Sequence, residues 1–133
     1  MTGSRVVRGL TGVYNADGGF RGEVAYAIGK VRGTAHCALC DLTHRGLHQR
    51  PEWGALVATL PVPFTTVHLN ERADEVAAAS EGRTPCVIAH TDTGPVVVLG
   101  PEELEQVGTS VLRFDQILRD ALDAAGLLLP QSE

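Results

Sequence analysis

The chain has 133 residues, a formal net charge of −5, 44% hydrophobic residues and three cysteines, and a chain of this length typically forms one domain without disulfides. The acidic balance offers no basic surface for phosphates, so we expect no nucleic-acid partner. No stretch approaches the roughly 18 consecutive apolar residues of a membrane span. Because the N-terminus also lacks the apolar core of a secretory signal, we expect a cytoplasmic protein without a membrane partner.

The first third of the chain predicts one strand and one helix. Residues 5–14 are rich in valine and lead into the turn residues 15–19, which indicates a strand followed by a tight loop. Apolar side chains then recur at the helical interval over residues 19–32, and Asp17 is placed to cap that helix. Gly33 suits its end.

The middle of the chain predicts two short helices, a strand and a third helix. Helices over residues 37–48 and 51–60 form an insertion of about residues 34–60. Residues 64–69 are β-branched and aromatic and predict a second strand. A short helix follows, which Asp74 is placed to cap.

The last third of the chain predicts a hairpin and a C-terminal helix. Residues 86–90 and 95–99 are apolar and flank an Asp-Thr-Gly turn, which predicts two antiparallel strands. A helical turn over residues 102–107 precedes a helix over residues 111–125, which Ser110 is placed to cap. The whole chain therefore predicts a single α/β domain, a four-stranded mixed sheet flanked by helices.

The segment from Arg83 to Ile88 carries a Thr84-Pro85 step at the entry to the third strand. Together with the order of elements, this step resembles the thioredoxin-like superfamily, whose members have a cis-proline there that faces the active site. The resemblance implies a thioredoxin-like sandwich over residues 1–133, with a helical insertion that carries Cys-x-x-Cys. A thioredoxin has its cysteine pair directly after the first strand, whereas this chain has Asn15 to Gly19 there. The chain also resembles an uncharacterised bacterial family with a Tyr-Asn-Ala-Asp-Gly-Gly turn and a His-Cys-Ala-Leu-Cys-Asp segment.

The densest group of reactive side chains lies in residues 36–48, which contain two cysteines and three histidines. In a reducing compartment a close cysteine pair is more often catalytic or metal-binding than a structural disulfide. A continuous helix would place four of these side chains on one face: Cys37, Cys40, His44 and His48.

The cluster predicts a site for a soft metal ion. Thiolate and imidazole ligands suit zinc, copper or iron, and Cys37, Cys40 and His44 supply three of them. The fourth ligand would be Cys86, His68 or water. We therefore expect a soft-metal-binding protein, and a small metalloenzyme if one coordination position stays open.

The cysteine pair also fits thiol–disulfide exchange, in which Cys37 attacks and Cys40 resolves the mixed disulfide. The protein would then be an oxidoreductase acting on a small molecule or a thiol partner protein. In a third interpretation it is a non-catalytic interaction module whose cysteines only pack in the core. Metal binding leads among these three interpretations.

A second group of candidates follows from the topology of open α/β sheets, which bind ligands beyond the carboxyl ends of their parallel strands. The loops after the first two strands and the start of the third would meet there. Their side chains offer a nucleophile, acid–base groups and an anion-binding arginine: Asn15, Asp17, His68, Asn70, Glu71, Arg72 and Cys86. Cys86 is the nucleophile of this set and is predicted to be catalytic, like the cysteine pair. The two groups form one site only if the pair folds over the same edge.

Overall fold

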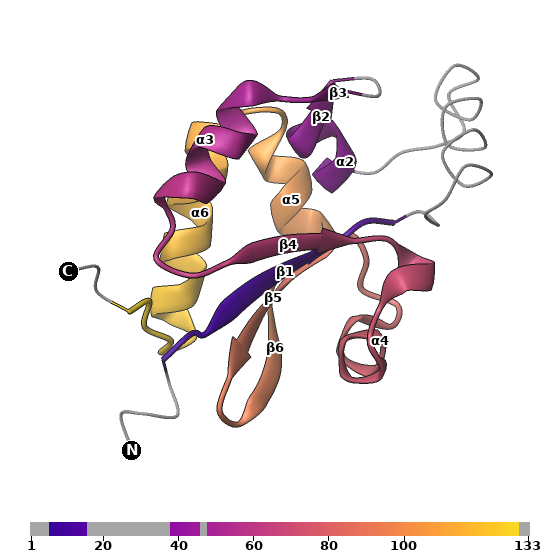
Figure 1. Cartoon of the computed structure of the whole chain (residues 1–133), viewed down its shortest axis with the longest axis vertical. Coiled ribbons are helices and arrows are strands. Elements are labelled where there is room, and N and C mark those ends of the chain that lie inside the picture. Colours follow the sequence, from indigo (N-terminus) through magenta and orange to yellow (C-terminus); the bar gives the residue numbers. More distant parts are fainter. Residues whose placement is uncertain (1–5, 16–37, 46–47, 131–133) are drawn as a thin grey trace.

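The computed structural model describes residues 6–15, 38–45 and 48–130. A four-stranded sheet lies between helices on its two faces (Figure 1). In chain order the elements are β1 (Gly9–Val13), α2 (Ala38–Thr43), β2 (His44–Arg45), β3 (His48–Gln49), α3 (Pro51–Thr59), β4 (Phe64–Val67), the 3-10 helix η2 (Leu69–Glu71), α4 (Asp74–Ser80), β5 (Cys86–Thr91), β6 (Gly94–Leu99), α5 (Pro101–Val107) and α6 (Val111–Ala124).

The sheet has the strand order β4-β1-β5-β6. β1 runs parallel to β4, with Leu10 opposite Phe64, and antiparallel to β5, with Gly12 opposite Val87. β5 and β6 form an antiparallel hairpin. The predicted α/β fold with a four-stranded mixed sheet is thus confirmed, and the carboxyl ends of β1 and β4 meet at one edge of the sheet.

Side chains alternate between the two faces of the sheet, and each face has its own core. Val87 and Ala89 of β5 belong to the larger core, which includes residues of α3, α5 and α6. Cys86 and Ile88 belong to the smaller core, together with Val76 of α4. Figure 1 shows α3 and α6 on one side of the sheet and α4 on the other. The sheet therefore separates two groups of buried side chains.

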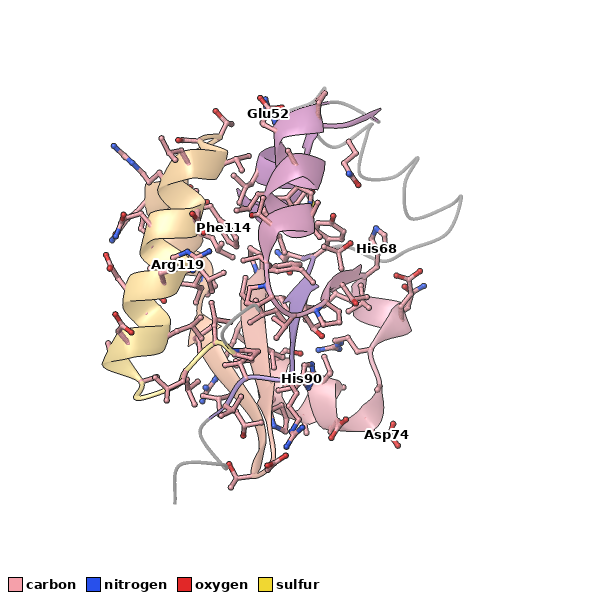
Figure 2. All side chains as sticks on the ribbon, turned by 60° about the vertical axis from the view of Figure 1, so that its left-hand side comes forward. Glu52, His68, Asp74, His90, Phe114 and Arg119 are labelled. Atoms are coloured by element: carbon pink, nitrogen blue, oxygen red, sulfur yellow. The ribbon has the colours of Figure 1, made fainter. Side chains whose placement is uncertain are left out.

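Three aromatic side chains hold α3 and α6 together on the larger core. Trp53 of α3 packs edge-on against Phe64 of β4 and Phe114 of α6, with ring centroids 5.1 Å apart in both pairs. Phe114 is fully buried and lies between these two helices (Figure 2). Such aromatic pairs contribute about 0.5–1.5 kcal/mol each beyond the burial of their area.

Two of the three predicted helix N-caps lie within the described residues, and one of these two agrees with the structure. Ser110 caps α6, because its hydroxyl accepts a hydrogen bond from the backbone N–H of Arg113 at 3.1 Å. Asp74 is not the cap of α4: Ala73 holds that position, and Asp74 lies in the first turn, where its charge complements the helix dipole. No helix within the described ranges is long and apolar enough to cross a membrane.

The Thr84–Pro85 peptide bond is cis, as the resemblance implies for that step. The helix predicted over residues 19–32 lies outside the residues that the structure describes, as does its predicted cap, Asp17.

The predicted helix over residues 37–48 is wrong. α2 ends at Thr43, and His44 begins β2, where it lies opposite Gln49 of β3. The physical reason is the hairpin that follows, because the backbone N–H of Arg50 donates to the carbonyl of Thr43 at 2.8 Å. In a longer helix that carbonyl would accept from the residue four positions later. The prediction that four cysteine and histidine side chains share one helix face therefore fails.

Replacing Gly12 with valine is expected to destabilise the protein by about 1–3 kcal/mol. A Cβ at this position would lie 3.1 Å from Cδ2 of Leu39 and 3.2 Å from Cε1 of Phe64, so the new side chain would push α2 away from β1. Urea unfolding followed by circular dichroism measures the free energy of unfolding. Gly9→Val is the matched control, because the nearest atom to a Cβ there is the Pro63 carbonyl oxygen at 3.8 Å. Equal losses at both positions would contradict the close packing.

Candidate functional site

The helix that carries Cys40 lies directly on the first strand of the sheet. Gly12 of β1 leaves room for Leu39 of α2, as the short distance from its virtual Cβ shows. Leu39 and Leu42 are buried in the larger core, whereas Cys40 is only half-buried beside them. α2, which carries Cys40, thus packs against β1.

Tyr14 joins α2 to the end of β4. Its backbone N–H donates to the carbonyl of Val67 at 2.9 Å, which places it beside the parallel strand. Its hydroxyl forms a buried hydrogen bond with the hydroxyl of Thr43 at 2.9 Å. Its ring packs against His68, with centroids 4.9 Å apart. One buried side chain therefore connects the cysteine helix with a histidine at the carboxyl edge of the sheet.

His68 is held by Glu71 at the edge where β1 and β4 end. Oε1 of Glu71 accepts from the backbone N–H of His68 at 2.8 Å and lies 2.7 Å from Nδ1 of its ring. These two hydrogen bonds, the backbone one first, lower the pKa of the Glu71 carboxyl. Figure 2 shows His68 on the side of the molecule away from Arg119 of α6.

The ionisation of Glu71 fixes the tautomer of His68. An ionised carboxylate only accepts hydrogen bonds, so the proton between the two groups belongs to Nδ1. The lone pair of Nε2 then remains for another group. The imidazole side chain is about a quarter exposed, at 27%, so an ion or small molecule can reach it.

Asn15 ties the end of β1 to the segment before β5. Its Oδ1 accepts a hydrogen bond from the hydroxyl of Thr84 at 2.9 Å. The carboxyl end of β1 and the start of β5 therefore meet as predicted. Asn70 lies within η2 at the same edge.

Arg72 has a structural role at this edge. Its Nε donates to the carbonyl of Leu69 at 2.9 Å, and one terminal nitrogen donates to the buried hydroxyl of Ser80 at 3.0 Å. The other terminal nitrogen lies 3.5 Å from the Glu81 carboxylate. The guanidinium thus fastens η2 to α4.

Cys86 lies on the opposite face of the sheet from Cys40. It is fully buried in the smaller core, whereas Cys40 packs against the larger one. Burial raises the pKa of the Cys86 thiol to about 11, although Arg72 and Arg83 oppose the shift. The thiol is therefore protonated at neutral pH, which disfavours it as an attacking thiolate. The expectation that Cys86 completes a ligand set with Cys40 is wrong, because the sheet separates them.

The rest of the predicted ligand set stays a prediction. Cys37 and Asp17 lie outside the described residues, and for His44 only the backbone position at the start of β2 is described. In the part of the chain that the structure describes, no three His, Cys, Asp or Glu side chains gather to hold a metal ion.

Two connecting residues were missed in the sequence, although both carry a signal there. Tyr14 directly precedes the turn that begins at Asn15, so it sits at the predicted carboxyl end of a strand. Thr43 follows Cys40 by three residues, the spacing of side chains that are neighbours on a helix. What the sequence did not reveal is that these two hydroxyls meet.

Comparisons of the chain with protein-family models, curated proteins and solved structures find no match.

The hydrogen bond between Tyr14 and Thr43 is expected to stabilise α2 on the sheet. Tyr14→Phe should cost about 1–3 kcal/mol of unfolding free energy, because the buried Thr43 hydroxyl loses a partner. A double-mutant cycle with Thr43→Val, measured by chemical unfolding, isolates the pair. We expect a coupling energy of about 0.5–3 kcal/mol, and purely additive losses would show that the two hydroxyls do not act together.

Cys86 is expected to react slowly with iodoacetamide at neutral pH in the folded protein, because the reactive form is the thiolate and the thiol pKa is raised to about 11. Its rate should rise about tenfold per pH unit as pH approaches that value, as long as the fold persists. Mass spectrometry of the labelled peptides measures the rate, and unfolded protein provides the control. Equal rates for Cys86 in folded and unfolded protein would contradict this burial.

Proposed function

We propose that the chain binds a soft metal ion, namely zinc, copper or iron, through the thiolates of Cys37 and Cys40 and the imidazole of His44. Thiolate with imidazole is the donor combination that these ions prefer. α2 begins at Ala38, and Cys40 lies in its first turn. Leu39 and Leu42 of this helix are buried, whereas Cys40, which lies between them in sequence, is half-buried.

The observation that carries this proposal is the connection from α2 through Tyr14 to His68. Tyr14 contacts Thr43 of α2 and the imidazole of His68 at the same time. A thiol-bearing helix and a histidine therefore lie at one edge of the sheet, although 28 residues separate Cys40 and His68 in sequence. With Cys86 on the other face, the fourth position is left to His68 or water.

We propose further that the fold is thioredoxin-like. The order β4-β1-β5-β6 supports this assignment: the first two main strands are parallel, the last two form a hairpin, and α6 follows them. The Thr84-Pro85 step directly precedes β5. In this proposal the cysteine pair belongs to a helical insertion ahead of α3, after the position where a thioredoxin carries its pair.

Thiol–disulfide exchange is the second candidate function, and the strand order favours it. In this alternative the Cys37 thiolate attacks a disulfide of a small molecule or of a partner protein, which releases one thiol and leaves a mixed disulfide. Cys40 then displaces the second thiol by forming a Cys37–Cys40 disulfide, so the substrate disulfide is reduced while the cysteine pair is oxidised. The half-buried position of Cys40 beside Leu39 suits a resolving thiol that the substrate does not reach.

Metal content of the full chain tests the proposal. Protein purified without chelator should carry about one zinc, copper or iron ion per chain, and the Cys37→Ser/Cys40→Ser variant should lose this ion. Inductively coupled plasma mass spectrometry measures the metal content. Cys86→Ala is the matched control and should keep its metal, because this thiol lies on the other face of the sheet.

Two results would contradict the proposed metal binding. The first is metal content that stays unchanged when both cysteines are replaced. The second is metal-free protein that folds normally and binds zinc, copper and iron only above millimolar concentration. In the second case, a reversible Cys37–Cys40 disulfide at a moderately oxidising potential would favour the thiol–disulfide alternative, and its absence the non-catalytic interaction module.

A further inference from the structure

We infer that the edge strand β4 and the adjoining helix α3 form an interface with a second copy of this chain. In this dimer the two β4 strands pair antiparallel across a two-fold axis at Thr65, so that the two sheets become one. The inference is independent of the proposed metal binding. Three features carry it: the open backbone of β4, the protected opposite edge and the uncharged surface of α3.

The outer backbone groups of β4 have no hydrogen-bond partner among the described residues. β4 lies at one edge of the sheet, beside β1. The carbonyls of Pro63 and Val67 accept hydrogen bonds from β1. In this parallel ladder the N–H and C=O groups of Phe64 and Thr66 therefore point away from the sheet. Another strand can pair with them there.

The opposite edge strand, β6, is protected against such pairing. Pro95 has no N–H to donate, and the register of β6 on β5 shifts between Val87 and Ile88. Proline and irregular register both keep an edge strand from pairing with another chain. β4 contains no proline and no charge, and it stays in register with β1 along its whole length. β4 is therefore the edge that a partner strand fits.

α3 supplies the additional area that a stable dimer needs. A typical interface covers about 800 Å² of each partner, roughly a tenth of the 7829 Å² of accessible surface here, and the four residues of β4 alone do not provide it. Trp53 of α3 packs against Phe64, so the helix lies over the edge strand (Figure 1). Beyond its first two residues, the exposed side chains of α3 are small and uncharged: Ala55, Ala58 and Thr59. Such side chains let a second helix approach closely.

Charge and symmetry favour a second copy as the partner. The chain has a net charge of −5, but residues 53–70, which include most of α3 and all of β4, contain no Asp, Glu, Lys or Arg. Two acidic copies can therefore approach along this surface without like-charge repulsion. A two-fold axis at Thr65 places Phe64 of each copy opposite Thr66 of the other, so their outward backbone groups pair. The two Thr65 side chains then lie directly opposite each other, and the two α3 helices lie side by side on one face of the joined sheet.

Analytical ultracentrifugation of the full chain at micromolar concentration tests the inference. We expect a dimer, which Thr65→Lys should weaken about tenfold because two like charges then lie directly opposite each other. Thr66→Pro should also weaken it, because this N–H points outward and its loss leaves the ladder with β1 intact. The matched control is Thr93→Lys, the same change at an exposed threonine in the turn between β5 and β6, which should leave the dimer unchanged. Circular dichroism shows whether each variant is folded.

A disulfide at the two-fold axis tests the register. Under mild oxidation, Thr65→Cys should link two copies through the introduced thiols, as peptide mapping by mass spectrometry shows, whereas Thr93→Cys should not. A chain that stays monomeric up to millimolar concentration would overturn the inference and leave the edge of β4 to a strand of another protein. A dimer that both Thr65→Lys and Thr66→Pro leave intact would also overturn it, because a different surface would then hold the copies together. The Cys37→Ser/Cys40→Ser variant should still form the dimer, so failure of the proposed metal binding is a separate result.

Discussion

The close contact between α2 and β1 is the constraint on which the candidate site depends. Gly12 has no side chain, so Leu39 of α2 packs closely against β1. The hydroxyls of Tyr14 and Thr43 also join these two elements through a buried hydrogen bond. With this contact, α2 and Cys40 lie beside Tyr14, near the edge where the two parallel strands end.

The sheet also separates Cys40 from Cys86, the two cysteines that the structure describes. Alternation along β5 sends Cys86 to the face of α4 and its neighbour Val87 to the face of α3 and α6. A single residue of register thus decides whether a thiol can join the site, and here it excludes Cys86. Its complete burial and high pKa are those of a packed core thiol, while Cys40 keeps partial access to solvent.

Periodicity and turn residues in the sequence were enough to predict the α/β class, the four strands and the helix capped by Ser110, because these depend on local preferences and on one buried face per element. The extent of α2 could not be predicted in this way. Its end depends on a hydrogen bond from Arg50 to Thr43, which exists only once the hairpin β2–β3 has formed. The packing of α2 on β1 could not be predicted from the sequence either, because it depends on the long-range contact between Gly12 and Leu39.

We propose that the thiolates of Cys37 and Cys40 and the imidazole of His44 together hold one soft metal ion. X-ray absorption at the zinc edge, on the full chain loaded with one equivalent of zinc, measures that coordination directly. The account predicts two sulfur neighbours at about 2.3 Å together with nitrogen neighbours at about 2.0–2.1 Å. A spectrum with only oxygen and nitrogen neighbours, and no sulfur, would contradict it.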